Sequence, residues 1–132
     1  LETAEDAKLA VKHGVDGIIV SNHGARAVES GRGTLDCLPE IIDAVNKKFP
    51  VLIDGGFRRG TDIFKAMALG ASAVCIGRPY IYGLGAYGAP GVAKVLQILR
   101  AEFALTMRQS GTASIAEITR SHVGYHQQTY TP

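Results

Sequence analysis

A glycine-rich turn between a strand and a helix constrains this chain more than any other feature. The turn, Asp54–Gly60, reads DGGFRRG; a short apolar stretch leads into it, and a helix-like stretch, 61–69, follows it. Glycine lets backbone N–H groups approach an anion closely, and the helix adds further N–H groups and the positive end of its dipole. Arg58 and Arg59 offer charged, planar forks for phosphate. The turn predicts a phosphate-bearing ligand; the alternative is a tight turn with two solvated arginines.

Size and composition fit one α/β domain. The 132 residues are 46% hydrophobic, which is enough for a core. No apolar run approaches the ~20 residues of a membrane span, and the polar first residues do not predict a signal peptide. A net charge of +2 is too small to argue for nucleic acid or membrane partners, and we expect neither. Cys37 and Cys75 lie in apolar surroundings, so we expect buried free thiols and a cytoplasmic location.

Hydrophobic spacing predicts alternating helices and strands. The strands are expected at 17–20, 51–53 and 73–76, and the first, without polar alternation, is expected to be buried on both faces. The helices are expected at 4–13, 34–48, 61–69, 90–109 and 114–118. Pro39 moves the expected start of the second helix toward residue 38. We expect residues 80–88 to form a short helical turn and a loop, and the tail from Ser121 to be loosely ordered.

An internal repeat indicates the fold class. Residues 6–14 correspond to residues 62–70, 56 positions later, and the strands that follow them then align as well. Helix–strand units repeated around a parallel sheet suggest a (β/α) barrel, which needs eight units and ~250 residues. Three strands make only part of one. We therefore predict the C-terminal part, about strands 6–8, of a TIM (β/α)8 barrel, at residues 1–123, followed by a tail at 124–132.

All three predicted strands end in polar or glycine-rich sequence, which indicates an active site at that edge. Ser21 and His23 follow the first strand, Asp54 the second, and Gly77 and Arg78 the third. Histidine as a residue type has an unperturbed pKa near the operating pH, so His23 suits acid–base catalysis. Arg26, close behind it, suits a carboxylate. A structural histidine is the alternative for His23 taken alone.

These residues carry a resemblance to the FMN-dependent α-hydroxy acid oxidase/dehydrogenase family, which includes glycolate oxidase and lactate oxidase. The similar motifs are SNHGAR at 21–26, DGGFRRGTD at 54–62, KAMALGA at 65–71 and IGRP at 76–79. The chain departs from the family pattern at Ala27-Val28-Glu29, where Gln-Leu-Asp is common. The segments that would form the family's first five strands are missing.

The resemblance implies a reaction and a role for each residue. The reaction is oxidation of a small L-2-hydroxy acid to the 2-oxo acid, with two electrons passing to FMN. His23 would be the catalytic base and Arg26 would bind the substrate carboxylate. The residues that would hold FMN are Ser21, Asp54, Gly55, Gly56, Phe57, Arg58, Gly77 and Arg78.

The resemblance also implies partners. We expect the N-terminal portion of the barrel, in the same or a separate chain, and a homotetramer. A peroxisomal location is the alternative to a cytoplasmic one for a eukaryotic source, although the C-terminal sequence carries no recognisable targeting signal.

The residues themselves predict no metal site, because His122 and His126 have Gly124 between them and no third ligand.

Two other functions stay open. One is a non-catalytic half-barrel that binds FMN or phosphate, or only associates with itself. The other is a phosphate-binding barrel of another reaction type, against which the SNHGAR motif argues.

Overall fold

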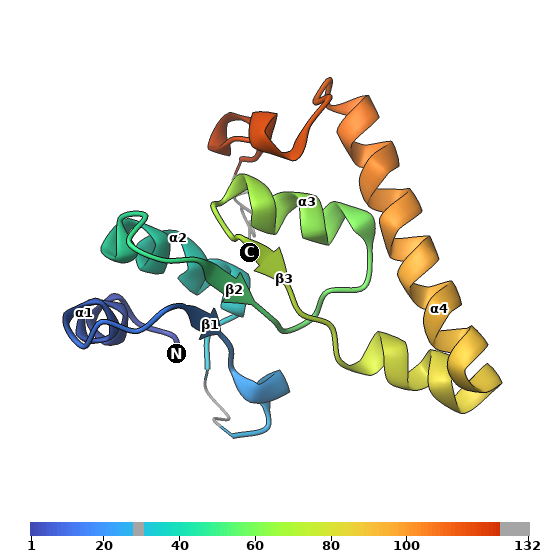
Figure 1. Ribbon diagram of the computed structural model, residues 1–132, viewed down its shortest axis with the longest axis horizontal. Helices are drawn as coiled ribbons and strands as arrows, with labels where there is room; N and C mark the ends of the chain where they lie inside the picture. Colours follow the sequence, from blue (N-terminus) through green and yellow to red (C-terminus); the bar gives the residue numbers. More distant parts are fainter. Residues whose placement is uncertain (28–30, 125–132) are drawn as a thin grey trace, which may run out of the picture.

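A computed structural model describes residues 1–27 and 31–124. Its centre is a parallel sheet in which β2 (Val51–Ile53) lies between β1 (Ile18–Val20) and β3 (Ala73–Val74). Ile18 pairs with Val51, and Leu52 pairs with Ala73. The three strands therefore point the same way, and the residues that follow them meet at one edge of the sheet (Figure 1). The predicted parallel α/β fold is confirmed for the described residues.

Among the described residues, four α-helices and three short 3-10 turns accompany this sheet. The helices are α1 (Ala4–Lys12), α2 (Thr34–Val45), α3 (Gly60–Ala68) and α4 (Arg78–Gln109). The turns are η1 (His23–Ala25), η2 (Ile115–Glu117) and η3 (Arg120–His122). None of the helices that the structure describes is long and apolar enough to cross a bilayer.

The predicted repeat is confirmed in α1 and α3. Both helices have nine residues, and they start 56 positions apart. Each ends before a glycine in the left-handed region, Gly14 with φ +68° and Gly70 with φ +110°. At the start of α1 the Thr3 side chain accepts the Asp6 N–H at 3.2 Å. Thr3 is therefore the N-cap that the sequence predicts.

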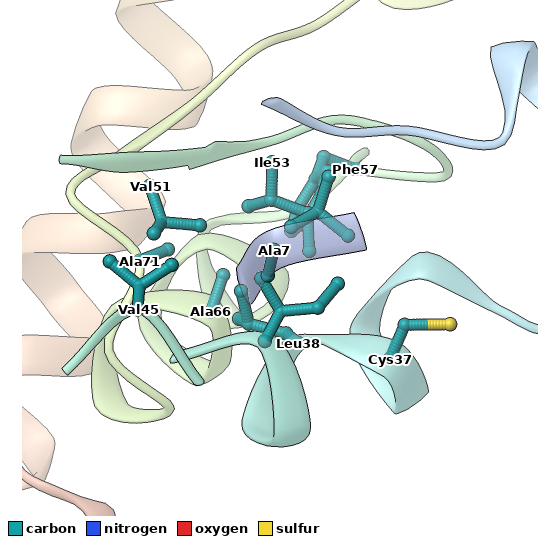
Figure 2. Close-up of a cluster of buried hydrophobic side chains, with 11 residues drawn as sticks. Ala7, Cys37, Leu38, Val45, Val51, Ile53, Phe57, Ala66 and Ala71 are labelled. Atoms are coloured by element: carbon teal, nitrogen blue, oxygen red, sulfur yellow. The ribbon is translucent and has the colours of Figure 1, made fainter. Parts of the chain in front are cut away.

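The core lies between one face of the sheet and helices α1–α3. Val51 and Ile53 point into it, with Leu38 from α2 and Ala66 from α3 (Figure 2). Ile19 points to the opposite face, because side chains alternate along a strand, and it is 48% exposed. The prediction that this first strand is buried on both faces is therefore wrong for the chain as described. No described segment covers that face at Ile19.

Helix α2 differs from its prediction at both ends. It begins at Thr34 rather than near residue 38, and it keeps Pro39 inside. Proline removes one backbone hydrogen bond from a helix interior, and the four buried apolar residues of α2 offset that loss: Cys37, Leu38, Ile41 and Val45. The helix ends before Asn46, which has a left-handed φ of +47°, so it is shorter than the predicted 34–48.

Helix α4 corrects the prediction for residues 80–88. These residues are helical, and a kink at Tyr87 and Gly88 joins them to the predicted helix 90–109. The two segments meet at two glycines, since a Cβ on Gly91 would collide with the Gly83 carbonyl. Figure 1 shows the bend in α4 and its longer segment running beside α3. Without side chains at positions 83 and 91, the segments can fold back on each other.

Strand β3 is shorter than predicted, because it ends at Val74 rather than Ile76. The Cys75 N–H still donates to the Ile53 carbonyl at 2.8 Å, after which the chain leaves the sheet. Cys37 is buried as expected, but Cys75 is only half-buried. Its position at the carboxyl edge of the sheet explains the difference.

The C-terminal segment is partly ordered by contacts with the helices. The His122 ring packs edge-on against Phe64 of α3 at 5.9 Å. Arg120 donates to Asp43 of α2 at 2.7 Å. The prediction of a loose tail from Ser121 is therefore wrong for residues 121–122. The rest of that tail, 125–132, including His126, lies outside the described residues.

Candidate active site

The candidate site lies where the three strands end. Asp54 donates its backbone N–H to the Val20 carbonyl at 3.0 Å, which continues the pairing of β1 and β2 past their ends. The Ser21 hydroxyl donates to Asp54 Oδ2 at 2.9 Å. Ser21 and Asp54, 33 residues apart in the chain, are thus in direct contact, as expected for residues that follow neighbouring parallel strands.

A cavity of about 150 Å³ opens at this edge, between the segments after β2 and β3. It is lined by Gly24, Asp54, Gly55, Gly56, Phe57, Arg58, Cys75, Ile76, Gly77, Arg78 and Pro79. Seven of the eight residues predicted to hold a cofactor are among them. The eighth, Ser21, reaches the cavity indirectly, through Asp54.

Backbone N–H groups are the main donors that line this cavity. Gly55 and Gly56 have φ values of +94° and +80°, in the region that favours glycine. The N–H groups of Gly55, Gly56, Phe57, Gly77 and Arg78 donate to no other described residue. Arg78 is the first residue of α4, and no side chain caps this helix. The N-terminus of α4 and the glycine turn therefore present free donors to one cavity, an arrangement suited to an anion.

Asp54 brings an acceptor to the same cavity. Its backbone carbonyl accepts the Thr34 hydroxyl at 2.6 Å, and its Oδ2 accepts the Ser21 hydroxyl. Its Oδ1 is buried and has no hydrogen-bond partner among the described residues. Since a buried carboxylate oxygen without a partner is costly, Oδ1 is suited to accept a hydroxyl from a bound ligand.

The N-terminus of α3 corrects part of the phosphate prediction. Asp62 Oδ2 accepts the N–H groups of Arg58 and Arg59, at 3.0 and 2.9 Å. Glu102 Oε2, from α4, accepts the N–H of Gly60 at 2.8 Å. Glu102 also pairs with the Arg59 guanidinium at 3.0 Å. The expectation that this helix end and Arg59 serve the anion is therefore wrong, because carboxylates of the chain already occupy them.

Phe57 contributes to the cavity through its backbone. Its residue is 4% exposed, and its ring lies in the core beside Ile53 (Figure 2). The ring therefore anchors the turn to the core. Arg58, which is exposed, is the arginine of the turn that lines the cavity.

The SNHGAR segment forms a turn of unusual backbone conformation beside the cavity. His23, Gly24 and Ala25 have φ values of +54°, +68° and +61°, all in the left-handed region. The Asn22 side chain accepts the Ala25 N–H at 3.1 Å, and the Ser21 hydroxyl accepts the His23 N–H at 3.2 Å. Left-handed backbone at residues with a Cβ is strained, and such strain concentrates at functional sites.

The side chains of this turn face solvent. His23 and Arg26 are exposed, and only Gly24 of the turn lines the cavity. Over residues 1–27 and 31–124, neither the His23 ring nor the Arg26 guanidinium has a hydrogen-bond or ion-pair partner. The structure therefore brings the predicted cofactor residues together at the cavity. The predicted catalytic pair, His23 and Arg26, lies beside the cavity and does not line it.

Arg32 closes the base of the loop that carries this turn. Its guanidinium pairs with Glu40 of α2 at 2.6 Å and donates to the Glu2 carbonyl at 3.0 Å. Its own carbonyl accepts the Asn22 side-chain amide at 3.4 Å. The hydrogen bond with Arg32 lowers the pKa of the Glu40 carboxyl, and the same bond raises the pKa of Arg32. Two departures from the family pattern, Val28 and Glu29, lie outside the described residues.

Sequence reasoning assigns no role to several residues of the site. Thr34, Asp62 and Glu102 hold the turn from outside, and Cys75 completes the lining together with Gly24, Ile76 and Pro79, which lie within the similar motifs. Asp62 could have been found, since an acid in the first turn of a helix often accepts N–H groups from its start. In the described part of the chain, no three His, Cys, Asp or Glu residues gather as a metal site would require.

Fold and site together define a parallel α/β protein with a cradle of unpaired backbone N–H groups, those of Gly55–Phe57 and Gly77–Arg78, at the carboxyl edge of its sheet. Comparison with known proteins makes this more specific. The family model for FMN-dependent dehydrogenases matches residues 1–125. The chain therefore belongs to the FMN-dependent dehydrogenase family, and the family and the cofactor named from the motifs, FMN, are confirmed at that level.

Individual relatives agree with this assignment. The chain is 57% identical to glycolate oxidase of Spinacia oleracea, over 92% of this chain and 33% of that protein. It is 56% identical to a peroxisomal (S)-2-hydroxyacid oxidase of Arabidopsis thaliana, over 93% of this chain and 34% of that protein. The chain thus spans about a third of the length of these relatives.

A solved structure shows that the backbone is shared. The structure of a soluble mutant of the membrane-associated (S)-mandelate dehydrogenase of Pseudomonas putida superposes with a TM-score of 0.91 at 41% identity. The match covers 96% of this chain and 36% of that one. The described arrangement of helices and strands is therefore that of one part of a larger enzyme fold.

Proposed function

We propose that this chain is the C-terminal portion of an FMN-dependent (S)-2-hydroxy-acid oxidase or dehydrogenase. The complete protein would oxidise a small L-2-hydroxy acid to the 2-oxo acid. The observation that carries the proposal is the cradle: unpaired N–H groups of Gly55–Phe57 and Gly77–Arg78 line one cavity with a buried, unpartnered Asp54 Oδ1.

The residues of the cradle fit the phosphate and ribityl parts of FMN. The N–H groups and the charges of Arg58 and Arg78 suit the phosphate, and Asp54 Oδ1 suits a ribityl hydroxyl. Ser21 supports this contact through its bond to Oδ2. The cavity of about 150 Å³ is smaller than the about 300–1,000 Å³ that encloses a whole ligand of drug size. The flavin ring would therefore lie outside it, toward the end of β1.

His23 and Arg26 would act on the substrate. Oxidation removes two electrons and two hydrogens, one from the hydroxyl and one from the carbon that bears it. The imidazole of His23 accepts a proton from the substrate, and the Arg26 guanidinium holds its carboxylate through two parallel hydrogen bonds. FMN, when bound, supplies the two-electron acceptor.

The rest of the protein would complete the barrel. We assign residues 1–123 to about strands 6–8 of a TIM barrel and residues 124–132 to a tail. Support comes from the two open sheet edges, at β1 and β3, and from Ile19, which is 48% exposed on the inner face. Earlier strands would pair with the β1 edge and bury Ile19. They would also supply a partner for the His23 ring.

Substrate, assembly and location follow from the same proposal. Glycolate, lactate and mandelate are the candidate substrates, because they are small 2-hydroxy acids of the class that the relatives' names describe. We propose a homotetramer without nucleic acid or membrane partners. A cytoplasmic location is proposed for a bacterial source, and a peroxisomal one for a plant source, in line with the name of the Arabidopsis relative.

A second function has one observation in its favour. His23 is exposed and has no ring partner in the part that the structure describes. A half-barrel that binds FMN or phosphate without turnover would have the same cradle and a His23 with no catalytic role. The two functions differ in whether substrate reduces the bound flavin.

Reduction of the flavin under anaerobic conditions tests the proposal. The full-length protein that contains this chain is purified, its visible spectrum is recorded, and glycolate, (S)-lactate or (S)-mandelate is added without oxygen. We expect a flavin band that bleaches with at least one of them and persists with the (R)-enantiomer of a chiral acid. A bound flavin that no 2-hydroxy acid bleaches would favour the non-catalytic function, and a protein without affinity for FMN would contradict both.

A further inference from the structure

Glu102 connects α4 to the back of the glycine turn. It lies on the longer segment of α4, 42 residues beyond Gly60. Its Oε2 accepts the Gly60 N–H at 2.8 Å and the Arg59 Nε–H at 3.1 Å, and its Oε1 lies 3.0 Å from a terminal nitrogen of Arg59. This is the paired, planar geometry of a strong arginine–carboxylate contact. One side chain thus binds two successive residues of the turn.

The contact is rigid, because the backbones of α3 and α4 meet at the same point. Gly60 is buried, and a Cβ on it would collide with the backbone of Glu102 and Phe103. Phe103 also packs against Phe64, with ring centres 6.4 Å apart. The Glu102 side chain is 28% exposed, so water competes with its hydrogen bonds less than at the open surface.

Glu102 also limits which N–H donors remain available to a phosphate. Glu102 accepts the first N–H of α3, that of Gly60, and pairs with the Arg59 guanidinium, while Asp62 accepts the N–H groups of Arg58 and Arg59 just before the helix. The unpaired donors that remain face the other way, into the cavity, on Gly55–Phe57 and Gly77–Arg78. Arg78, at one wall, belongs to the short segment of α4, and Glu102, behind the other wall, belongs to the longer segment. The contact between Gly83 and Gly91 holds these two segments together, so α4 links the two walls.

We propose that Glu102 is a positioning residue for the phosphate of FMN. It acts through Arg59 and Gly60, which hold the Gly55–Arg58 turn at the spacing from α4 that a phosphate needs. This inference rests on the proposed function, since it assumes that the cradle binds FMN. It assigns a role to a residue that is not among those lining the cavity.

Affinity for FMN relative to riboflavin is the test. Riboflavin has the same ring and ribityl chain but no phosphate, so a displaced phosphate cradle weakens FMN alone. The full-length protein is stripped of flavin, and each ligand is titrated by its fluorescence. Glu102→Ala is expected to raise the Kd for FMN about tenfold, as loss of charge-assisted hydrogen bonds does, and to change the Kd for riboflavin by less than twofold.

Two further variants separate positioning from general stability. Glu117→Ala is the matched control, because Glu117 also accepts a backbone N–H, from Ala113 at 3.0 Å, but lies away from the cavity. It should lower the melting temperature without changing either Kd. Glu102→Gln keeps an acceptor for Gly60 and loses the ion pair, so its Kd for FMN should lie between those of Glu102→Ala and Glu117→Ala. This variant also keeps the test usable if Glu102→Ala does not fold.

The outcomes that overturn the inference are distinct from failure of the proposed function. Equal losses of FMN and riboflavin affinity in the Glu102 variants, or no loss, overturn the positioning role while the wild type still prefers FMN. A wild type that binds both flavins equally overturns the phosphate cradle and the inference together. A wild type that prefers FMN but is not reduced by any 2-hydroxy acid removes the catalytic proposal and leaves the test of Glu102 valid.

Discussion

The cradle after β2 and β3 and the turn after β1 lie at the same edge of one sheet, yet they differ in how they are held. The cradle is supported on several sides, by Thr34, Asp62 and Glu102 and by the buried ring of Phe57. The His23–Ala25 turn is tied by short contacts to Ser21 and Asn22 and carries exposed side chains.

In the proposed function, the cradle binds the cofactor and the turn carries the groups that act on the substrate. The donors of the cradle are fixed by contacts among the described residues, so the proposed specificity for phosphate would be contained in this chain. The groups of the turn lack an orienting partner in the described residues. Under the proposed function, the orientation of the His23 ring would therefore depend on residues from the rest of the barrel. Substitutions in the two regions should therefore fail in different ways.

The largest effect is expected at His23. In the full-length protein, His23→Gln removes the base and should lower kcat by about 10²–10⁴-fold, the range for loss of a general base. The Kd for FMN should stay within twofold, because His23 does not line the cavity. Steady-state kinetics and flavin titration measure both. A His23→Gln protein that loses its flavin would show that the two regions are not separable.

A large effect on the cradle is expected at Gly55. Its φ is +94°, and a Cβ there would lie 2.9 Å from the Thr34 hydroxyl oxygen. Gly55→Ala should therefore displace the turn and raise the Kd for FMN more than tenfold. Gly111→Ala is the control, since Gly111 has a similar φ of +71° but open space around it. It should lower the melting temperature, as strained backbone does, and leave the Kd unchanged.

An intermediate effect distinguishes the two parts of the cradle. Arg78→Ala should raise the Kd for FMN about tenfold and hardly affect riboflavin, because the guanidinium is proposed to meet the phosphate. Asp54→Asn should weaken both flavins, because Asp54 Oδ1 is proposed to accept a ribityl hydroxyl that both ligands carry. Titration of each variant with both flavins checks this. If both variants changed the affinities for FMN and riboflavin in the same proportions, the proposed division of the cradle into a phosphate part and a ribityl part would be contradicted.

The smallest effect concerns the base of the catalytic loop and depends on pH. Because the hydrogen bond with Arg32 lowers the pKa of the Glu40 carboxyl in the folded protein, the pair adds stability above the ordinary pKa of a glutamate, and this stability is lost as the pH falls through the lowered pKa. Glu40→Gln should reduce the melting temperature slightly at pH 7, with a difference that vanishes in acid. Thermal scans of both proteins across pH check the sign; a difference that grows in acid would contradict it.

Much of the cradle could be predicted from the sequence because its residues are close together. Asp54–Arg58 and Gly77–Arg78 each follow a strand directly, and parallel strands bring such residues to one edge. The family resemblance named FMN, which the phosphate chemistry alone could not. The strands and the ends of α1 were predictable for the same local reason, since capping and apolar runs act over a few residues.

Contacts between distant segments could not be predicted in this way. Glu102 lies 42 residues beyond the turn that it holds, and its side chain has no local role that marks it. The helical course of residues 80–88 depends on Gly83 packing against Gly91, although glycines in a single sequence indicate a loop. The exposure of Ile19 could not be predicted either. The apolar sequence of β1 indicates burial on both faces, whereas no described segment covers Ile19.

The preference of the wild-type protein for FMN over riboflavin tests the central claim most directly. Both dissociation constants are measured on the full-length apoprotein under the same conditions. If the unpaired N–H groups and arginines of the cradle bind the phosphate, FMN should bind at least about a hundredfold more tightly, since each charge-assisted hydrogen bond contributes about 1.5–3 kcal/mol. Equal affinity for the two flavins would contradict the account.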